Sequence, residues 1–262
     1  MASRPVWDGA ITFGMVTIPV GLFTATEEKE VHFNQLHKGC GARVKYQKTC
    51  PVHEKVLTAD EIERGYEVSK GNYVVITDED LENLPIPSKH VIEVTAFVKV
   101  GEIDPLYFDR PYYIQPREMG KKPLALLMRA LTDKGVAALG KVALRNRETL
   151  CLIRVTEDAL ILELLHWPDE IRKPAELDVK KSDVDEKQLK MAESLIDLLA
   201  DEFKPDEYHD EFREALKMKI EEKAEGHQAQ PAPEAEPAKV IDLMEALRAS
   251  VEAAKDARRK SS

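Results

Sequence analysis

Long apolar runs and a secretory leader are both missing from this 262-residue sequence. No window approaches the ~20 uninterrupted apolar residues that a membrane-spanning helix needs. The start of the chain, MASRPVWDGAITFG, lacks the charged-then-apolar layout of a signal peptide. The two absences together predict a soluble cytoplasmic protein.

Cysteine is scarce as well, with three residues in the whole chain. An odd number in a chain of this length does not make a disulfide framework, so reduced thiols or metal ligands are expected. The sequence also contains no glycine-rich phosphate loop, no G-x-S-x-G and no H-E-x-x-H motif. Its carboxylates lie mostly in solvated runs without a spacing that isolates an acid/base pair. No catalytic residue and no organic cofactor are therefore predicted.

Positive charge is in deficit overall but concentrated in one place. The chain carries a net charge of −10, yet residues 121–154 hold eight basic and two acidic residues, a local charge of +6. Residues 157–214 hold nineteen acidic and eight basic residues, a local charge of −11. A basic patch in an acidic chain indicates a polyanionic partner, with nucleic acid as the first candidate.

Short runs of β-branched or alternating apolar residues predict a mainly β core. Residues 10–25 are read as two strands, and single strands are expected at residues 31–36, 72–77, 91–100, 150–155 and 160–166. Several antiparallel strands around one helix predict a barrel or curled sheet, within an α+β fold that is mainly β.

The basic segment itself divides into a helix and a strand. Pro123 suits the first helical position, and Gly135 suits the residue after the last turn. Leu124, Leu127, Met128 and Leu131 form an apolar stripe between them. The period then changes to that of a strand, which places Lys141, Arg145 and Arg147 on one face ahead of a turn at residues 146–148.

Two cysteine–histidine pairs offer a metal site. His37, Cys40, Cys50 and His53 present two pairs with two-residue spacings, and Cys2His2 is a common zinc shell. The alternatives are a redox turn at CPVH, which has no βαβ context, and reduced thiols beside unrelated surface histidines. Cys151 alternates into a strand face and is expected in the core.

A second acidic cluster at Asp78, Glu79 and Asp80 has a simpler explanation than a metal. Thr77 and Asp80 have the spacing of a capping box, and a helix N-terminus favours negative charge.

The C-terminal part is predicted to be helical. Residues 186–223 predict two amphipathic helices, the second opened by Pro205, that form a cap or an arm packing on a partner chain. Residues 224–237 are predicted to be a flexible linker. Residues 238–262 predict an amphipathic helix with a basic tip, KDARRKSS, that either docks on a partner or folds back on its own core.

Several long strings resemble the bacterial Ku family of non-homologous end joining, and the resemblance runs from Trp7 to about Leu216. The strings are VWDGAITFGMVTIPVGLFTATEEKEVHFNQLHKGC, GYEVSKGNYVVITDEDLENL, EIDPLYFDRPYYIQP, ALGKVALRNRETL and LIDLLADEFKPDEYHDEFREAL. The resemblance implies a non-enzymatic homodimer, built on an antiparallel β-barrel with a bridge, that closes into a ring around a broken duplex end.

The resemblance also assigns parts of the chain. It implies a core at residues 1–185 with a zinc-ribbon-like bridge at about 36–55, in which His37, Cys40, Cys50 and His53 hold zinc. Residues 186–223 match the dimerisation arm. The last helix is similar to the element that engages ATP-dependent DNA ligase D, through Ile241, Met244, Leu247 and Val251. The short tip differs from the long lysine-rich tails of some relatives, so tail-dependent bridging of DNA is not expected.

A ring that accepts any end cannot read bases and should contact phosphates. The residues expected to line it are Arg43, Lys45, Lys48, Lys121, Lys122, Lys141, Arg145 and Arg147. Two other functions remain open on the residues alone. One is a lyase that uses a clustered lysine on abasic DNA ends, and the other is a barrel protein that binds single strands or RNA.

Overall fold

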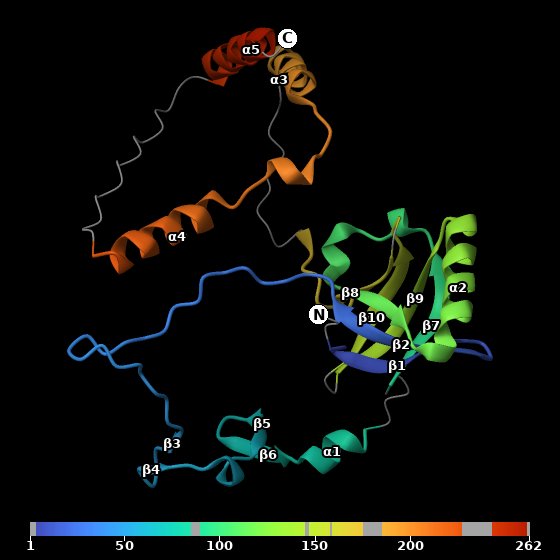
Figure 1. Ribbon diagram of the computed structural model, residues 1–262, viewed down its shortest axis with the longest axis vertical. Coiled ribbons are helices and arrows are strands. Elements are labelled where there is room, and N and C mark those ends of the chain that lie inside the picture. The colour runs from blue at the N-terminus through green and yellow to red at the C-terminus, as the bar shows by residue number, and fades with distance from the viewer. Residues whose placement is uncertain are drawn as a thin grey trace. The chain divides into compact units, whose positions relative to one another are not determined.

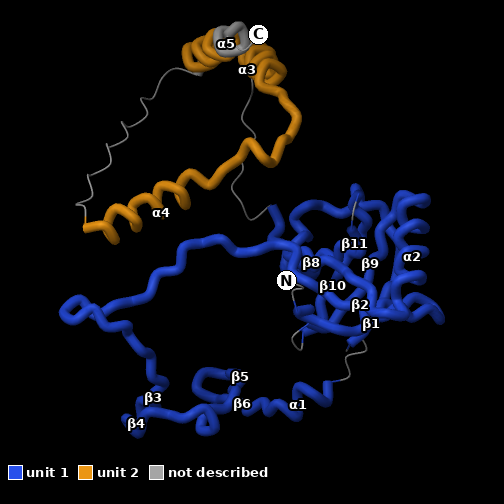
Figure 2. Tube along the Cα trace, in the orientation of Figure 1, with its two compact units in different colours: residues 1–176 blue, residues 177–262 orange. Residues whose placement is uncertain are grey.

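The computed structural model describes residues 4–84, 90–144, 147–157, 159–174, 185–226 and 243–260. The chain divides into two compact units, residues 1–176 and 177–262 (Figure 2). None of the helices in these described stretches is long and apolar enough to cross a membrane.

A closed β-barrel dominates the first unit (Figure 1). Within the described residues it has seven strands. In barrel order they are β1 (Trp7–Phe13), β2 (Val16–Thr24), β8 (Phe108–Pro116), β11 (Leu160–Leu165), β10 (Arg147–Val155), β9 (Ala137–Leu144) and β7 (Val91–Val98). The predicted barrel is confirmed, and so are the two strands expected in residues 10–25.

One seam of the barrel corrects the expectation of an antiparallel sheet. Six neighbouring pairs are antiparallel, but β1 and β7 run parallel, with Ala10 opposite Val91. The chain leaves the barrel after β2 and re-enters it at β7 in the direction of β1. Parallel neighbours need a long connection, and residues 25–90 supply it. Apolar periodicity carries no information about strand direction, which is why the sequence did not reveal this seam.

Aliphatic side chains fill the barrel. Ile11, Ile18, Leu22, Ile92 and Leu162 are fully buried in one cluster. The helix α2 (Lys121–Lys134) packs on this cluster through Leu124, Leu127 and Leu131, which confirms the predicted stripe.

The ends of α2 differ in how well the sequence predicted them. The helix begins at Lys121, so Pro123 is its third residue and not its first. The N-cap is Gly120, where a side chain does not fit, because a Cβ would lie 2.3 Å from the carbonyl oxygen of Pro19. Gly135 ends the helix with a φ of 63°, as predicted for a C-terminal glycine.

The excursion between β2 and β7 has no core of its own, since none of residues 24–84 is buried. It contains the short strands β3 (Thr49–Cys50) and β4 (Lys55–Val56), the hairpin of β5 (Arg64–Ser69) and β6 (Asn72–Ile76), and the helix α1 (Asp78–Glu82). The predicted capping box of Thr77 and Asp80 is confirmed, and the hydrogen bonds from Thr77 lower the pKa of Asp80. The strand expected at residues 31–36 is wrong, since only Leu36 makes an isolated bridge, to Arg43.

The second unit contains the helices α3 (Glu186–Leu199), α4 (Glu211–Ala224) and α5 (Leu243–Lys260). Asp185 caps α3 by accepting hydrogen bonds from the backbone of Lys187 and Gln188. Asp210 caps α4, so this helix begins later than Pro205, which opens only a single 3-10 turn. The linker predicted at residues 224–237 lies mostly outside the described residues.

The pair of Arg154 and Glu163 on neighbouring strands leads to a stability prediction. Glu163 is buried, and its carboxylate accepts two hydrogen bonds from the Arg154 guanidinium, at 3.0 and 2.6 Å. Replacing Arg154 with Met should lower the free energy of unfolding by about 2 kcal/mol, because it leaves a buried carboxylate unpaired. The measurement is urea unfolding at fixed protein concentration.

The matched control is Arg129→Met, which breaks the exposed i,i+4 pair with Asp133. It should cost no more than about 0.5 kcal/mol. Equal losses for the two variants would show that burial of Glu163 does not decide the effect.

Candidate nucleic-acid interface

The basic segment at residues 121–154 is partly neutralised by its own neighbours. Arg129 pairs with Asp133 at 2.9 Å, Lys141 with Glu148 at 3.4 Å and Arg154 with Glu163 at 2.6 Å. Asp133 and Glu148 are the two acids of the segment itself. The local charge therefore overstates what is available to a partner.

Four cations of the segment make no ion pair within the described residues: Lys121, Lys122, Lys134 and Arg147. Lys121 and Lys122 are exposed and lie in the first turn of α2. That end of a helix carries the positive end of the dipole and favours anions, so two lysines there do not stabilise the helix. The same features suit an external phosphate, which would meet two ammonium groups at the positive end of the helix dipole.

Lys141 and Arg147 do not share a face of one strand, which corrects the prediction. Arg147 is the first residue of β10, where it lies opposite Leu144, while Lys141 lies in β9 opposite Leu150. Directly opposed residues share a face, and positions 141 and 144 are an odd number apart, so the two cations point to opposite sides. Lys141 also lies 5.6 Å from the ring centre of Trp167. Arg145 lies outside the described residues.

Arg147 instead lies beside a cation that the sequence analysis missed. Arg147 and Arg110 both line a cavity of about 330 Å³, which also takes in Trp7 and Trp167. Arg110 belongs to β8, in a proline- and tyrosine-rich stretch where the sequence predicted no strand. No local pattern marked Arg110, because the cavity that it lines together with Arg147 is formed by strands distant in the sequence.

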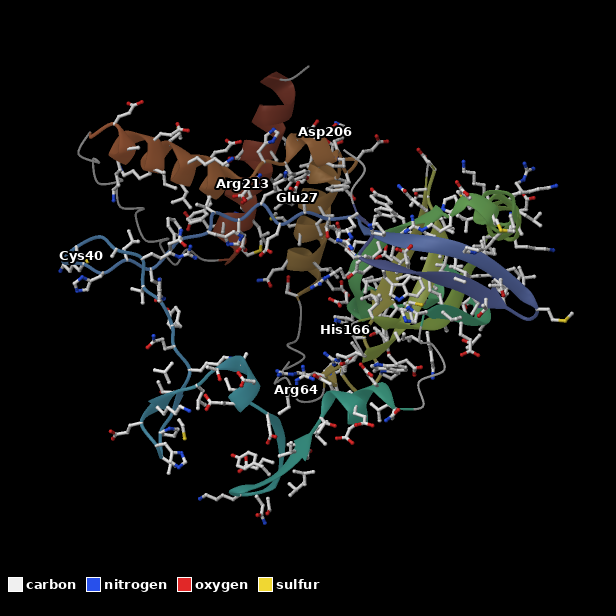
Figure 3. The ribbon with its side chains drawn as sticks, turned by 60° about the horizontal axis from the view of Figure 1, so that its bottom comes forward. Glu27, Cys40, Arg64, His166, Asp206 and Arg213 are labelled. Atoms are coloured by element: carbon white, nitrogen blue, oxygen red, sulfur yellow. The ribbon has the colours of Figure 1, made fainter. Side chains whose placement is uncertain are left out.

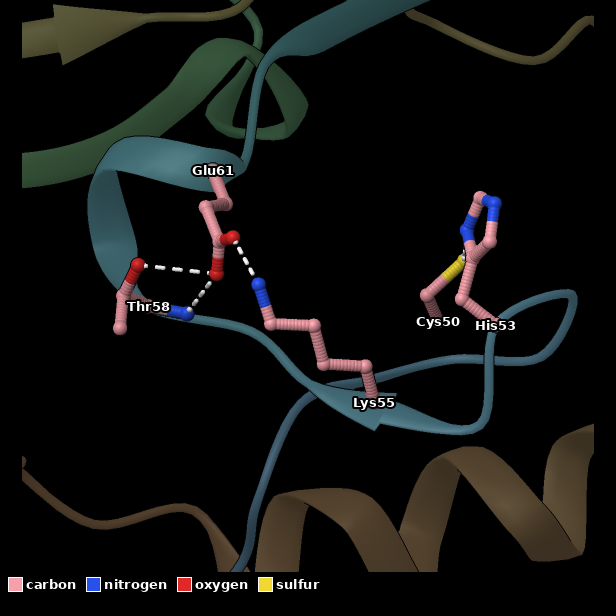
Figure 4. Close-up of polar contacts among 5 residues, drawn as sticks. All are labelled: Cys50, His53, Lys55, Thr58 and Glu61. Atoms are coloured by element: carbon pink, nitrogen blue, oxygen red, sulfur yellow. Dashed lines mark hydrogen bonds and ion pairs between the residues drawn. The ribbon is translucent and has the colours of Figure 1, made fainter.

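The excursion between β2 and β7, called the bridge segment from here on, carries a second group of exposed cations. Arg43, Lys45 and Lys48 are all exposed and make no ion pair among the described residues. Lys38 and Lys70 share these properties and were not predicted. Other cations of the segment are paired, as Arg64 is with Asp78 at 2.7 Å and Lys55 with Glu61 (Figure 4).

The cysteines and histidines form two separate pairs. His37 Nδ1 lies 3.1 Å from Cys40 Sγ, and Cys50 Sγ lies 3.4 Å from His53 Nδ1 (Figure 4). Zinc bonds of about 2.3 Å to sulfur and 2.0–2.1 Å to nitrogen, at a tetrahedral angle, give a ligand separation of about 3.5 Å. Each pair therefore has the spacing of half a zinc shell. Among the described residues, however, no three such ligands come together.

Tight turns hold each pair in place. The first turn is closed by the hydrogen bond from Gly41 N to His37 O, at 2.8 Å, and Gly41 has a φ of 69°. Cys40 lies at the tip of this turn (Figure 3). The second turn joins β3 to β4, with Cys50 opposite Lys55. The third cysteine, Cys151, is buried in the barrel as predicted, and burial raises the pKa of its thiol to about 12.

The residues predicted to dock a partner lie on α5. Met244, Leu247 and Val251 are half-buried on one side of that helix, and Ile241 lies outside the described residues.

Comparison with known sequences places this combination of barrel, bridge and helices in one family. A sequence profile described as the Ku70/Ku80 beta-barrel domain matches residues 12–191, more than half of the chain. The chain belongs to the Ku family. The match includes the end of β1, the other six barrel strands, the bridge segment, α2 and the first part of α3. The cations and the cysteine and histidine pairs described above therefore lie within the family's domain, and α5 lies outside it.

Individual Ku relatives match nearly the whole chain. A non-homologous end joining protein Ku from Symbiobacterium thermophilum is 43% identical over 97% of this chain. Proteins of the same name from Bacillus subtilis and Streptomyces avermitilis are 40% and 42% identical over 94% and 98% of it. The chain spans 64% of the length of the first relative, and 81% and 82% of the other two.

Proposed function

We propose that this chain binds the ends of double-stranded DNA without sequence preference, as a homodimeric ring, and acts in double-strand break repair by non-homologous end joining. The observation that carries the proposal is the set of exposed, unpaired cations on the barrel and bridge of a Ku-family chain. Phosphate contact alone suits a protein that must accept any broken end, since base contacts would select sequences. No catalytic role is proposed for any residue.

The proposed homodimer is supported by apolar side chains of the bridge segment that are exposed to solvent. Large apolar side chains are exposed on the hairpin of β5 and β6, including Tyr66 at 68% and Tyr73 at 62%. An isolated two-stranded hairpin is marginally stable in water, and uncovered apolar surface of this kind marks an interface. A second copy of the chain is the partner that the family resemblance implies. The arm at α3 and α4 is proposed to contribute to the same dimer, because Ile196, Leu199 and Phe212 are exposed there.

The lysine pair at the start of α2 leads to a quantitative prediction. Replacing Lys121 and Lys122 together with Gln should lower affinity for a blunt duplex. It should also reduce the slope of log K against log salt by about 1.8 per copy, or about 3.6 for the proposed dimer, if each lysine neutralises one phosphate. The measurement is fluorescence anisotropy with a labelled blunt duplex over a series of salt concentrations.

Arg129→Gln is the matched control, because it removes a cation from the same helix that is already paired with Asp133. It should leave the slope within error of the parent value. An unchanged slope for the lysine variant would remove the start of α2 from the DNA-binding surface.

We also propose that one zinc ion joins the two halves of the bridge, with His37, Cys40, Cys50 and His53 as ligands. The spacing within each pair supports this, since each holds one nitrogen and one sulfur at nearly the separation that a tetrahedral ion requires. Bound zinc would link the turn of residues 37–41 to that of β3 and β4. It would thereby order a segment that has no buried residue to hold it.

Zinc analysis and thiol counting test this together. Protein purified without a nickel column should contain about one zinc per chain, which matches one four-ligand shell. A thiol reagent at pH 8 should react slowly with Cys40 and Cys50 until a chelator is added. Cys151 should stay unreactive until the protein unfolds, because its pKa is about 12. Less than a tenth of an equivalent of zinc, or no chelator effect, would refute the site.

Recruitment of ATP-dependent DNA ligase D is proposed for the C-terminal helix. The half-buried stripe of Met244, Leu247 and Val251 supports this, since an amphipathic helix can present such positions to a partner's groove.

A further inference from the structure

The apolar stripe of α5 already has a partner within its own unit. Met244, Leu247 and Val251 recur at i, i+3 and i+7 and are half-buried, while the residue after each of them, Glu245, Arg248 or Glu252, is exposed. The helix that α5 packs against is α3 (Figure 1). A lone helix with one apolar side would expose that side, so the contact with α3 accounts for its partial burial.

The surface of α3 divides into a covered and an uncovered side. Met191, Leu195 and Leu198 recur at i, i+4 and i+7 and are half-buried. Leu189 and Ile196 are 47% and 66% exposed on the same helix. The apolar face of α3 is therefore wider than α5 alone can cover, and α5 occupies one side of it.

We propose that α3 holds α5 as an intramolecular latch that competes with ligase D for the same stripe. This inference rests on the docking role proposed above. A partner groove reads an amphipathic helix through anchors at i, i+3 and i+7, which are the positions now turned toward α3. One set of side chains cannot pack on two surfaces at once. Docking on α3 and docking on the ligase are therefore mutually exclusive.

The covalent connection makes the latch effective although the contact is small. Sixteen residues, 227–242, separate the end of the described part after α4 from the start of α5. The helix is thus presented to α3 at a local concentration that does not depend on dilution. The side chains are only half-buried, so the ligase can displace them. If about one chain in ten has α5 released, the apparent dissociation constant for the ligase is raised about 10-fold over that of the free helix.

The test uses the full chain and changes α3, so the α5 stripe stays intact. Met191→Glu combined with Leu195→Glu places two charges against the stripe. Leu198→Ala removes apolar surface from the same side without adding charge. Lys190→Glu is the control, because it adds the same side chain at an exposed position of α3 outside the half-buried stripe, roughly a quarter turn around the helix from it. Two quantities are measured: hydrogen exchange of the backbone amides of residues 243–255, and the dissociation constant for purified ligase D.

Under the proposal, the double variant exchanges its α5 amides about 10-fold faster and binds the ligase up to about 10-fold more tightly. Leu198→Ala changes both quantities in the same direction by a smaller factor, and Lys190→Glu changes neither. Unchanged exchange in both α3 variants overturns the latch, whatever the ligase does. Faster exchange with unchanged ligase affinity overturns the competition. Absence of ligase binding by every variant refutes the docking role itself, and the exchange data still decide the latch.

Discussion

Linear duplex DNA is expected to bind this chain roughly 100-fold or more tightly than a covalently closed circle of the same length and sequence. A ring is threaded from an end, and a circle offers none. Only contacts from the outside of the ring remain on the circle, and non-specific contacts of that kind typically have dissociation constants of about 10⁻⁴ to 10⁻⁶ M. The measurement is competition between the two forms for a labelled duplex at a fixed salt concentration.

Two controls isolate the ends from other properties of the DNA. Cutting the circle once with a restriction enzyme should restore tight binding, because it creates ends without changing sequence or length. Blocking both ends with biotin and streptavidin should abolish it. In the reverse order, the protein is first bound to linear DNA and the DNA is then circularised by ligation. This complex should resist dissociation by salt. Equal affinity for circles and linear molecules would refute threading.

Charges placed on the hairpin of β5 and β6 are expected to separate the proposed dimer and abolish end binding. Val68 and Val74 are exposed, and they line a shallow apolar cavity together with Tyr66 and Leu81. Replacing both valines with Asp should give a monomer, because two charges would be desolvated in the interface. Binding to a blunt duplex should fall to the non-specific level, since one copy of the proposed two-copy ring could not encircle DNA. The measurement is sizing by light scattering, with and without a duplex of about two helical turns.

Ser69→Asp combined with Asn72→Asp is the matched control, with the same two charges at the polar turn of the same hairpin. It should remain dimeric and bind ends. A dimeric valine variant would place the hairpin outside the interface. A monomeric variant that still binds ends tightly would show that one copy is sufficient.

Local patterns identified the elements whose formation depends on nearby residues. The capping box of Thr77 and Asp80 and the αL glycine at position 135 are short-range features and are confirmed. The stripe of α2 is a local repeat and is also confirmed. The strand expected at residues 31–36 failed because a strand requires a partner, and the structure pairs only Leu36. Neither helix start lies at the predicted proline, since α2 begins two residues before Pro123 and α4 begins after its cap at Asp210.

The candidate site was predicted in its composition and only partly in its geometry. Lys121, Lys122, Arg43, Lys45 and Lys48 are exposed as expected. The shared face of Lys141 and Arg147 failed because the hairpin turn falls between them, so an alternation counted along one strand does not apply. The pairing of Lys141 with Glu148, and the position of Arg110 beside Arg147, depend on contacts between strands.

The sequence by itself determined the family, the barrel with one helix, the uneven charge and the identity of the cysteine and histidine pairs. These follow from residue types and spacings of a few positions. Only the tertiary structure decided which cations of the basic segment remain unpaired and that one barrel seam is parallel. It also decided that the last helix packs on α3. Each of these depends on residues distant in the sequence, and chain direction and strand register bring such residues together.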